Sequence, residues 1–183
     1  MRILDTELAD VKLIEPTVHE DERGYFFEAF NARVFENLIG VKPNICQLNE
    51  SRSVRGTIRG LHAQKEPFSQ AKLVRVVRGE ILDVAVDCRL DSKTFGRCVS
   101  VLLSAENKYQ LWIPSGFAHG FQVLSEFCDL SYQVDKYYEP KAQLIVNPLD
   151  KFLNIRWNHK MTLTMSDQDR FAPGFLDVFQ RPS

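Results

Sequence analysis

The sequence predicts a single domain, residues 1–183, of mainly β structure, in which short strands form a sandwich, jelly roll or barrel. Short apolar runs are separated by turn residues along most of the chain. Helical signals are few: one short helix is predicted over 32–38, with Asn31 as its N-cap, and another after Ser166. The 183 residues include 44% hydrophobic side chains and 13 Phe, enough for one packed core.

Alternating apolar residues mark the strands. Residues 72–78 (KLVRVVR) and 80–88 (EILDVAVDC) flank Gly79 and are predicted to be two strands around a tight turn. In the second of them, apolar residues recur with a period of two, as expected for a strand. Further strands are predicted over 24–30, 45–52, 97–103, 109–113, 119–124 and 128–134.

The charge balance argues against large charged partners. The net charge is −1 with 26% charged residues, so neither a nucleic acid nor a membrane surface is expected as the main partner. The N-terminus has no signal-peptide pattern, and no apolar run approaches the ~18 residues of a membrane span. The cysteines form no C-x-x-C pair, so we expect reduced cysteines and a cytoplasmic protein; they are Cys46, Cys88, Cys98 and Cys128.

Some ionisable residues fall on strand faces that are otherwise apolar, where a barrel can hold a small ligand. Lys72 shares its predicted face with Val74 and Val76, and an unpaired charge is costly to bury. Lys72 therefore either reaches back to water from the strand end or takes part in a site. Asp83, on an apolar face of the next strand, is a hypothetical partner for it across the turn.

Two histidines lie beside glycines near predicted turns. His62 stands in Arg-Gly-Leu-His-Ala-Gln at 59–64, and His119 in Pro-Ser-Gly-Phe-Ala-His-Gly-Phe at 114–121. Each alone is consistent with a structural histidine, but together they resemble the paired motifs of cupins. Metal-binding cupins carry H-x-H in the first motif. Here Gln64 replaces the second histidine, so a three-ligand metal site is incomplete, and we predict no metal, with the histidines free for acid–base chemistry.

Other candidates have a structural interpretation beside the functional one. Tyr132 shares a strand face with Leu130 and is consistent with an amphipathic core tyrosine. Asp169 lies where Ser166 is expected to cap a helix, and nothing local marks it as functional. The segment 23–28 (RGYFFE) combines an arginine, aromatic rings and a carboxylate, which suits either nucleotide binding or an exposed edge strand with a salt bridge.

Taken together, these residues resemble the dTDP-4-dehydrorhamnose 3,5-epimerase family over nearly the whole chain. The matching segments are 21–26, Gln47 with Asn49, 59–62, 72–74, 87–89, 94–96, 103–107, 112–121, and Tyr132, Tyr138, Trp157, Ser166 and Asp169. The resemblance implies a cupin jelly roll with a few short helices. It also implies epimerisation of a dTDP-4-keto-6-deoxyhexose at carbons 3 and 5 through an enolate, without a cofactor, as in dTDP-L-rhamnose biosynthesis.

The same resemblance implies a role for each site residue. His62 would be the general base, oriented by Asp169. Tyr132 would be the general acid, and Lys72 would stabilise charge on the sugar keto oxygen. The substrate-binding residues would be Arg59, His119, Gln47, Asn49 and Tyr138, together with Arg23, Phe26 and Glu28, which would reach the nucleotide bound by the partner subunit of a homodimer.

The chain departs from the family pattern at four positions. Ala63 stands where an aromatic is usual, and Leu48 where an acidic residue is usual. Gln143 replaces a glutamate, and Gln168 replaces a lysine just before Asp169. These changes leave the base and acid in place, but they leave open the exact sugar and nucleotide and the number of centres inverted.

The sequence also leaves three alternative functions open. A mono-epimerase acting on a related nucleotide-linked 4-keto-deoxysugar would use the same base and acid. A metal-dependent cupin oxygenase would need a metal ligand where Gln64 stands, and metal analysis of the purified protein would detect a bound metal. A sugar-nucleotide-binding module without catalysis is disfavoured by the presence of His62, Tyr132 and Asp169.

Overall fold

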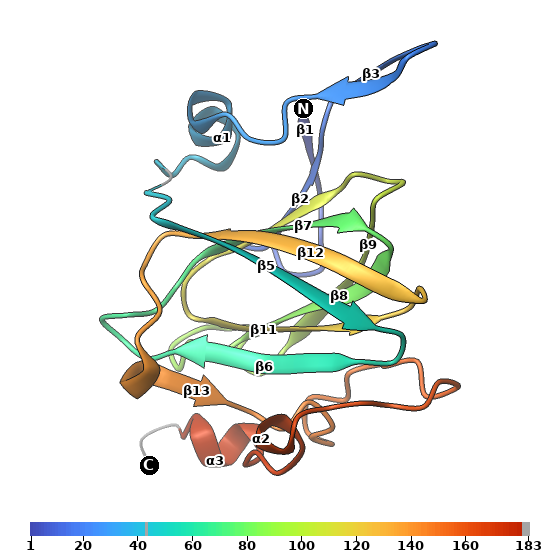
Figure 1. Ribbon diagram of the computed structural model, residues 1–183. Helices are drawn as coiled ribbons and strands as arrows, with labels where there is room; N and C mark the ends of the chain where they lie inside the picture. The colour runs from blue at the N-terminus through green and yellow to red at the C-terminus, as the bar shows by residue number, and fades with distance from the viewer. Residues whose placement is uncertain (43, 181–183) are drawn as a thin grey trace.

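The computed structural model describes residues 1–42 and 44–180, and its two antiparallel sheets face each other as a jelly roll (Figure 1). The six-stranded sheet contains, in spatial order, β1 (Arg2–Leu4), β2 (Lys12–Glu15), β10 (Gln110–Ile113), β7 (Lys72–Arg78), β12 (Phe127–Val134) and β5 (Gln47–Val54). The five-stranded sheet contains β13 (Gln143–Ile145), β6 (Ile58–Gln64), β11 (Phe117–Val123), β8 (Glu80–Asp87) and β9 (Cys98–Ser104). A separate hairpin consists of β3 (Val18–Asp21) and β4 (Gly24–Phe27).

Apolar side chains cover both faces of the five-stranded sheet. Between the sheets, Val74 and Leu111 belong to the same buried cluster as Ile81 of β8. On the other face, Val84 of β8 packs in a second cluster with the C-terminal segment, including Phe175. That segment carries α2 (Asp167–Arg170) and α3 (Phe175–Val178) and runs beneath β6 in Figure 1. The sheet that holds the predicted His62 motif is therefore supported from both sides.

The strands predicted over 72–78 and 80–88 are present, but the prediction that they form a tight hairpin is wrong. β7 pairs with β10 and β12, whereas β8 pairs with β9 and β11, so the chain crosses between the sheets at Gly79. Gly79 has φ of +86°, and a Cβ there would lie 2.2 Å from the carbonyl oxygen of Phe127. Local alternation does not distinguish the two arrangements, because pairing depends on strands that are distant in sequence.

The other predicted strands are confirmed, with ends that differ by up to three residues. The prediction lacked β1, β2, β3, β6 and β13. Both expected helices are present. α1 (Ala32–Ile39) follows Asn31, whose Oδ1 accepts hydrogen bonds from the first helical turn, and α2 follows Ser166, whose Oγ accepts from the backbone N–H of Asp169.

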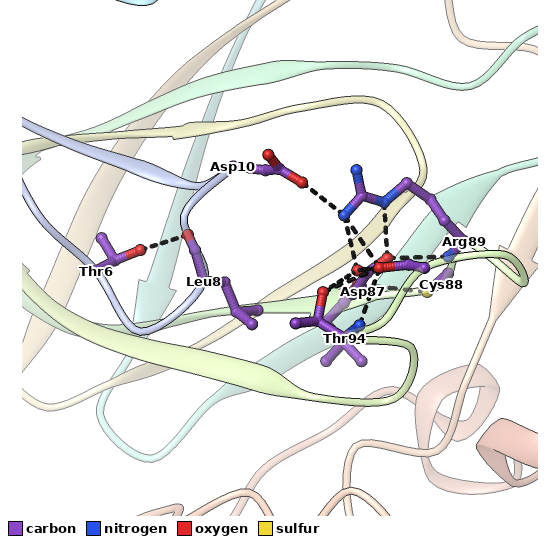
Figure 2. A network of polar contacts seen from close by, with 9 residues as sticks. Thr6, Leu8, Asp10, Asp87, Cys88, Arg89 and Thr94 are labelled. Atoms are coloured by element: carbon purple, nitrogen blue, oxygen red, sulfur yellow. Dashed lines mark hydrogen bonds and ion pairs between the residues drawn. The ribbon is translucent and has the colours of Figure 1, made fainter.

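A buried carboxylate fixes the loop between β8 and β9 (Figure 2). Asp87 accepts hydrogen bonds from the Arg89 guanidinium at 2.7 and 2.9 Å. The hydroxyls of Ser92 and Thr94 donate to it at 2.6 Å each. Burial alone would raise the pKa of Asp87, but these donors outweigh it and bring the pKa to about 2. Arg89 also contacts Asp10 at 2.7 Å, which ties the N-terminal loop to this network.

Two further features of the structure concern its cysteines and the lengths of its helices. All four cysteines are free in the structure. Among the residues that the structure describes, no helix has the length and hydropathy required to cross a bilayer.

Candidate active site

A pocket of about 360 Å³ opens between the two sheets. Strands of both sheets line it, together with the loops that follow β6 and β12. Its lining residues are Gln47, Asn49, Ser51, Arg59, His62, Ala63, Gln64, Gln70, Lys72, His119, Phe121, Leu130, Tyr132, Tyr138 and Gln143. The structure therefore brings together most of the predicted site residues, which are dispersed along the sequence.

His62 and Asp169 form a close pair. His62 lies on β6, and its Nε2 is 2.6 Å from Oδ1 of Asp169, which lies on α2 and is buried. Burial raises the pKa of Asp169, but hydrogen bonds from His62 and Ser166 outweigh it, so the pKa lies below its ordinary value. An ionised Asp169 holds the His62 proton on Nε2, which leaves Nδ1 as a proton acceptor.

The two histidines are cross-strand neighbours because of an unusually close approach of β6 and β11. His119 pairs directly with His62 in the antiparallel register. Behind them, a Cβ on Gly60 would lie 2.6 Å from Cα of Gly120, and Gly60 has φ of +117°. Only glycines allow the two backbones to come this close, and the register shifts just after His119.

Lys72 lies inside the pocket rather than reaching back to water, so that alternative is wrong. It is 7% exposed, and its Nζ donates to the carbonyl oxygen of His62 at 3.4 Å. Burial lowers the pKa of Lys72 to about 8, although the negative charge of Asp83 opposes this shift. Lys72 is therefore mostly charged at neutral pH but close to losing its proton.

Asp83 makes its hydrogen bond with His119, not with Lys72 as hypothesised. His119 Nε2 is 2.6 Å from Oδ1 of Asp83, and both residues are buried. The second oxygen of Asp83 is buried and bonds no residue in the described part of the chain. The pocket thus contains two imidazole–carboxylate pairs, and sequence reasoning found only one of them. The sequence feature that pointed to the second pair was the carboxylate of Asp83 on the otherwise apolar face of β8.

Tyr132 faces the pocket from the opposite sheet. It lies on β12, where it pairs with Asn49 of β5 and with Val74 of β7. Burial raises the pKa of Tyr132, partly offset by the positive charge of Arg59. The phenol therefore stays protonated and can donate at neutral pH. Arg59 itself is held by a hydrogen bond of 2.8 Å from its Nε to Oγ of Ser53.

One end of the pocket is built around Tyr138. Its backbone N–H donates to Oε1 of Gln47 at 3.1 Å, and its hydroxyl donates to Oε1 of Gln143 at 3.0 Å. Gln47 in turn donates to Asn49 at 2.8 Å. Gln143, where a glutamate was expected, therefore accepts the same kind of hydrogen bond from Tyr138 that a carboxylate would.

Three predicted binding residues lie outside this pocket. Arg23 and Phe26 belong to the β3–β4 hairpin, which projects away from the two sheets in Figure 1, and Glu28 follows it. Phe26 is 71% exposed, while Arg23 pairs with Asp21 across the turn. The structure therefore does not bring these three residues into the pocket of their own chain.

The remaining departures differ in their positions. Ala63 lines the pocket, so its small side chain leaves space there. Leu48 is 65% exposed and borders a different cavity, on the outer side of the six-stranded sheet. Gln168 lines a neighbouring cavity that shares Arg59 and His62 with the pocket. Ala63 therefore changes the lining of the pocket, Gln168 changes that of the adjoining cavity, and Leu48 changes neither.

The cupin-like motifs place His62, Gln64 and His119 around the pocket, where metal-binding cupins carry their ligands. Within residues 1–42 and 44–180, no three His, Cys, Asp or Glu side chains come together as a metal site. Gln64, which occupies the position of a cupin metal ligand, has its amide directed to backbone groups instead. The absence of a metal from the reaction remains a prediction.

An imidazole–carboxylate pair facing a half-buried tyrosine across a jelly roll defines an acid–base enzyme of the cupin class. The family profile described as dTDP-4-dehydrorhamnose 3,5-epimerase matches residues 5–177. The chain belongs to this family of carbohydrate epimerases.

Individual relatives support the same assignment. The dTDP-4-dehydrorhamnose 3,5-epimerase of Shigella flexneri is 49% identical over 97% of this chain and 98% of its own. The crystal structure of a Legionella pneumophila 3,5-epimerase in complex with dTDP-4-keto-L-rhamnose has a TM-score of 0.93 at 43% identity, covering 100% of this chain and 98% of that one. A 3'-monoepimerase from Streptomyces bikiniensis, in complex with dTDP-quinovose, has a TM-score of 0.89 at 35% identity, covering 96% and 87%.

Proposed function

We propose that this chain inverts carbons 3 and 5 of a dTDP-linked 4-keto-6-deoxyhexose and so forms a dTDP-4-keto-L-rhamnose-type product. The observation that carries the proposal is the placement of the His62–Asp169 pair on one sheet and Tyr132 on the other, around one pocket. The relatives named 3,5-epimerases are more similar in sequence than the 3'-monoepimerase, at 49% and 43% against 35% identity.

The substrate class suits these groups chemically. Carbons 3 and 5 flank the keto group at carbon 4, so the keto group acidifies their hydrogens. Removing one of these protons places the electron pair on the keto oxygen as an enolate. Returning a proton to the opposite face of the same carbon inverts it. Such a reaction needs a base, an acid on the other side and a positive charge near the oxygen.

His62 is the base in this proposal. Asp169 holds the Nε2 proton, so Nδ1 can take the proton from carbon 3 or 5. The imidazolium that forms is stabilised by the adjacent carboxylate. Asp169 is a positioning residue here, because it acts through His62 and not on the sugar.

Lys72 stabilises the enolate. Its ammonium lies in the buried part of the pocket, where an electrostatic interaction is worth more than in water. The His62 carbonyl holds Nζ beside the base. Asp83 favours the charged form of Lys72 and binds His119, which we assign to sugar or diphosphate contact.

Tyr132 completes inversion by donating its phenolic proton to the enolate carbon. After this transfer His62 carries one extra proton and Tyr132 has lost one. Exchange with solvent resets both groups, and the second carbon then reacts in the same way. The donor and acceptor lie on opposing sheets, which is the arrangement that inversion requires.

Arg59 supplies positive charge for the diphosphate. Its Nε bonds Ser53, and its Nη2 reaches the carbonyl oxygen of Arg52 at 3.4 Å, so no carboxylate in the described part of the chain neutralises it. Guanidinium groups bind phosphate oxygens well. Gln47, Asn49 and Tyr138 line the same pocket and contact the remainder of the substrate.

We also propose a homodimer in which the β3–β4 hairpin completes the partner's pocket. This would give Arg23, Phe26 and Glu28 the nucleotide contacts that their own chain does not offer. The exposed Phe26 and the projecting hairpin support this proposal. The same proposal includes one domain over residues 1–183, a reaction without a cofactor and a cytoplasmic location.

The test is product analysis. The purified protein is incubated with dTDP-4-keto-6-deoxy-D-glucose, the product is reduced with borohydride, and its sugar is identified by NMR. Sugars of the L-series, inverted at carbons 3 and 5, are expected. Inversion at carbon 3 alone would replace this proposal with the mono-epimerase, and unchanged substrate would reject both.

A further inference from the structure

The Gln64 amide has no role in the chemistry above, yet it is one of the most completely bonded side chains at the pocket. Gln64 ends β6, two residues after His62, and is 7% exposed. Its Nε2 donates to the carbonyl oxygen of Phe68 at 2.6 Å and to that of Tyr137 at 3.3 Å. Its Oε1 accepts from the backbone N–H of Glu139 at 2.7 Å. Every one of these partners is a backbone group.

The bonds to Tyr137 and Glu139 enclose Tyr138. One belongs to the peptide unit before Tyr138 and the other to the peptide unit after it, so a single side chain fixes both. The amide orientation is set by its partners, since the nitrogen meets two carbonyls and the oxygen meets an N–H. A buried amide satisfied in this way holds a loop without adding charge to the pocket.

Two other glutamines act on the same residue. Gln47 accepts from the backbone N–H of Tyr138, and Gln143 accepts from its hydroxyl. Gln47 lies on β5, Gln64 on β6 and Gln143 on β13, so the three come from both sheets. Tyr138 is 49% exposed and lies in an irregular segment. Loops of this kind are mobile unless side chains hold them.

We propose that Gln64 is a positioning residue that fixes the Tyr138 wall of the pocket before substrate arrives. The inference rests on the proposed function, because it assigns Tyr138 to substrate contact. Because the Tyr138 segment is already ordered before binding, less conformational entropy is lost when the substrate binds. Loss of the Gln64 bonds therefore weakens substrate binding and leaves the chemical step at His62 and Tyr132 largely unchanged.

A matched control exists on β11. Gln122 is fully buried, and its amide also binds only backbone: Nε2 donates to the carbonyl of Asn158 at 3.1 Å, and Oε1 accepts from the N–H of Asn158 at 2.7 Å. It does not line the pocket. Gln64→Met and Gln122→Met each remove a loop-holding amide while nearly keeping its volume.

The test compares kcat, KM and backbone amide exchange of the wild type and the two variants. With Gln64→Met, we expect KM to rise about tenfold, as for the loss of one to two net hydrogen bonds, with kcat within about twofold. Amide exchange at 137–139 should quicken. With Gln122→Met, KM should stay at the wild-type value although the thermal midpoint falls.

The outcomes separate the two proposals. An inactive wild type rejects the proposed function, while faster exchange at 137–139 and weaker binding of dTDP in Gln64→Met would still be measurable. An active wild type with an unchanged KM in Gln64→Met overturns the positioning role. So does an equal rise of KM in both variants, which would indicate general loosening of the structure.

Discussion

The charge of Lys72 depends on its immediate surroundings. Burial lowers its pKa to about 8, against the attraction of Asp83. Its ammonium donates to the His62 carbonyl, and Asp83 is itself bonded to His119, which lines the same pocket. A lysine in this environment is an electrostatic catalyst only while it remains protonated.

The pH dependence of catalysis should therefore show this titration. The protonated form stabilises the enolate, so we expect kcat/KM, which reports the groups of the free enzyme, to fall about tenfold per unit as pH rises above about 8. Lys72→Arg stays charged, so its slower rate should lack this alkaline decline. The measurement is kcat/KM against pH for both proteins. A wild-type profile flat through pH 9, or the same decline in Lys72→Arg, would contradict the assignment.

At this scale, part of the site was predictable from the sequence. His62, His119 and Tyr132 stood out from their motifs or strand faces, and the resemblance gave them roles. The bond from Asp83 to His119 was not predictable, because it joins β8 to β11, and the pairing of strands that are distant in sequence is not a local signal. Two of the backbone partners of Gln64, at Tyr137 and Glu139, were hidden for the same reason, since they lie in a loop that is distant in sequence.

At the scale of strands and loops, the contact between β6 and β11 positions both histidines. We predict that Gly60→Ala destabilises the protein by about 2 kcal/mol or more, because a Cβ would meet the β11 backbone and the residue would be strained at positive φ. Catalysis should fall with it, as His62 and His119 move. Thermal unfolding and kcat measure the two effects.

Gly40 provides the control for strain alone. It has φ of +77°, but a Cβ there would have nothing within 4 Å. Gly40→Ala should therefore cost about 1 kcal/mol and leave kcat unchanged. Equal losses of stability and of kcat in the two alanine variants would show that the close approach of β6 and β11 does not determine the effect of Gly60→Ala.

The Asp87 network makes a separate prediction about stability. The pKa of this carboxyl is about 2 in the folded protein, below the 3.8 of an unperturbed aspartate. Its contribution to the free energy of unfolding is thus present above pH 4 and lost as pH falls towards 2, amounting to about 2 kcal/mol. Urea unfolding at pH 7 and pH 3 should show Asp87→Asn destabilised at pH 7, with a smaller difference at pH 3. A difference that grows as pH falls would contradict this account.

Secondary structure was more predictable than strand pairing. Capping residues and alternation located α1, α2 and most long strands, because these signals are local, whereas the short helix α3 was not predicted. β6 was missed because glycine and histidine interrupt its apolar pattern. The separation of β7 from β8 was missed because Gly79 looks the same in a hairpin and in a crossing.

At the scale of the whole molecule, the proposed dimer makes each pocket depend on two chains. Arg23→Ala and His62→Ala should each be inactive alone. In mixed dimers, the subunit with intact His62 would receive Arg23 from its partner, so co-expression should restore about a quarter of wild-type activity. Activity of the mixture is compared with that of each variant. No recovery in verified mixed dimers would place Arg23 in its own chain's pocket or outside any site.

His62 and Tyr132 lie on opposing sheets and are proposed to act on opposite faces of the sugar, and solvent deuterium incorporation distinguishes their two roles. In deuterated water, the wild type should place deuterium at carbons 3 and 5 of dTDP-4-keto-6-deoxy-D-glucose, with inversion. Tyr132→Phe should still incorporate deuterium, because His62 can return it to the face from which the proton left, but without inversion. His62→Ala should incorporate none above the uncatalysed rate. Exchange that persists in His62→Ala, or inversion that persists in Tyr132→Phe, would contradict the account.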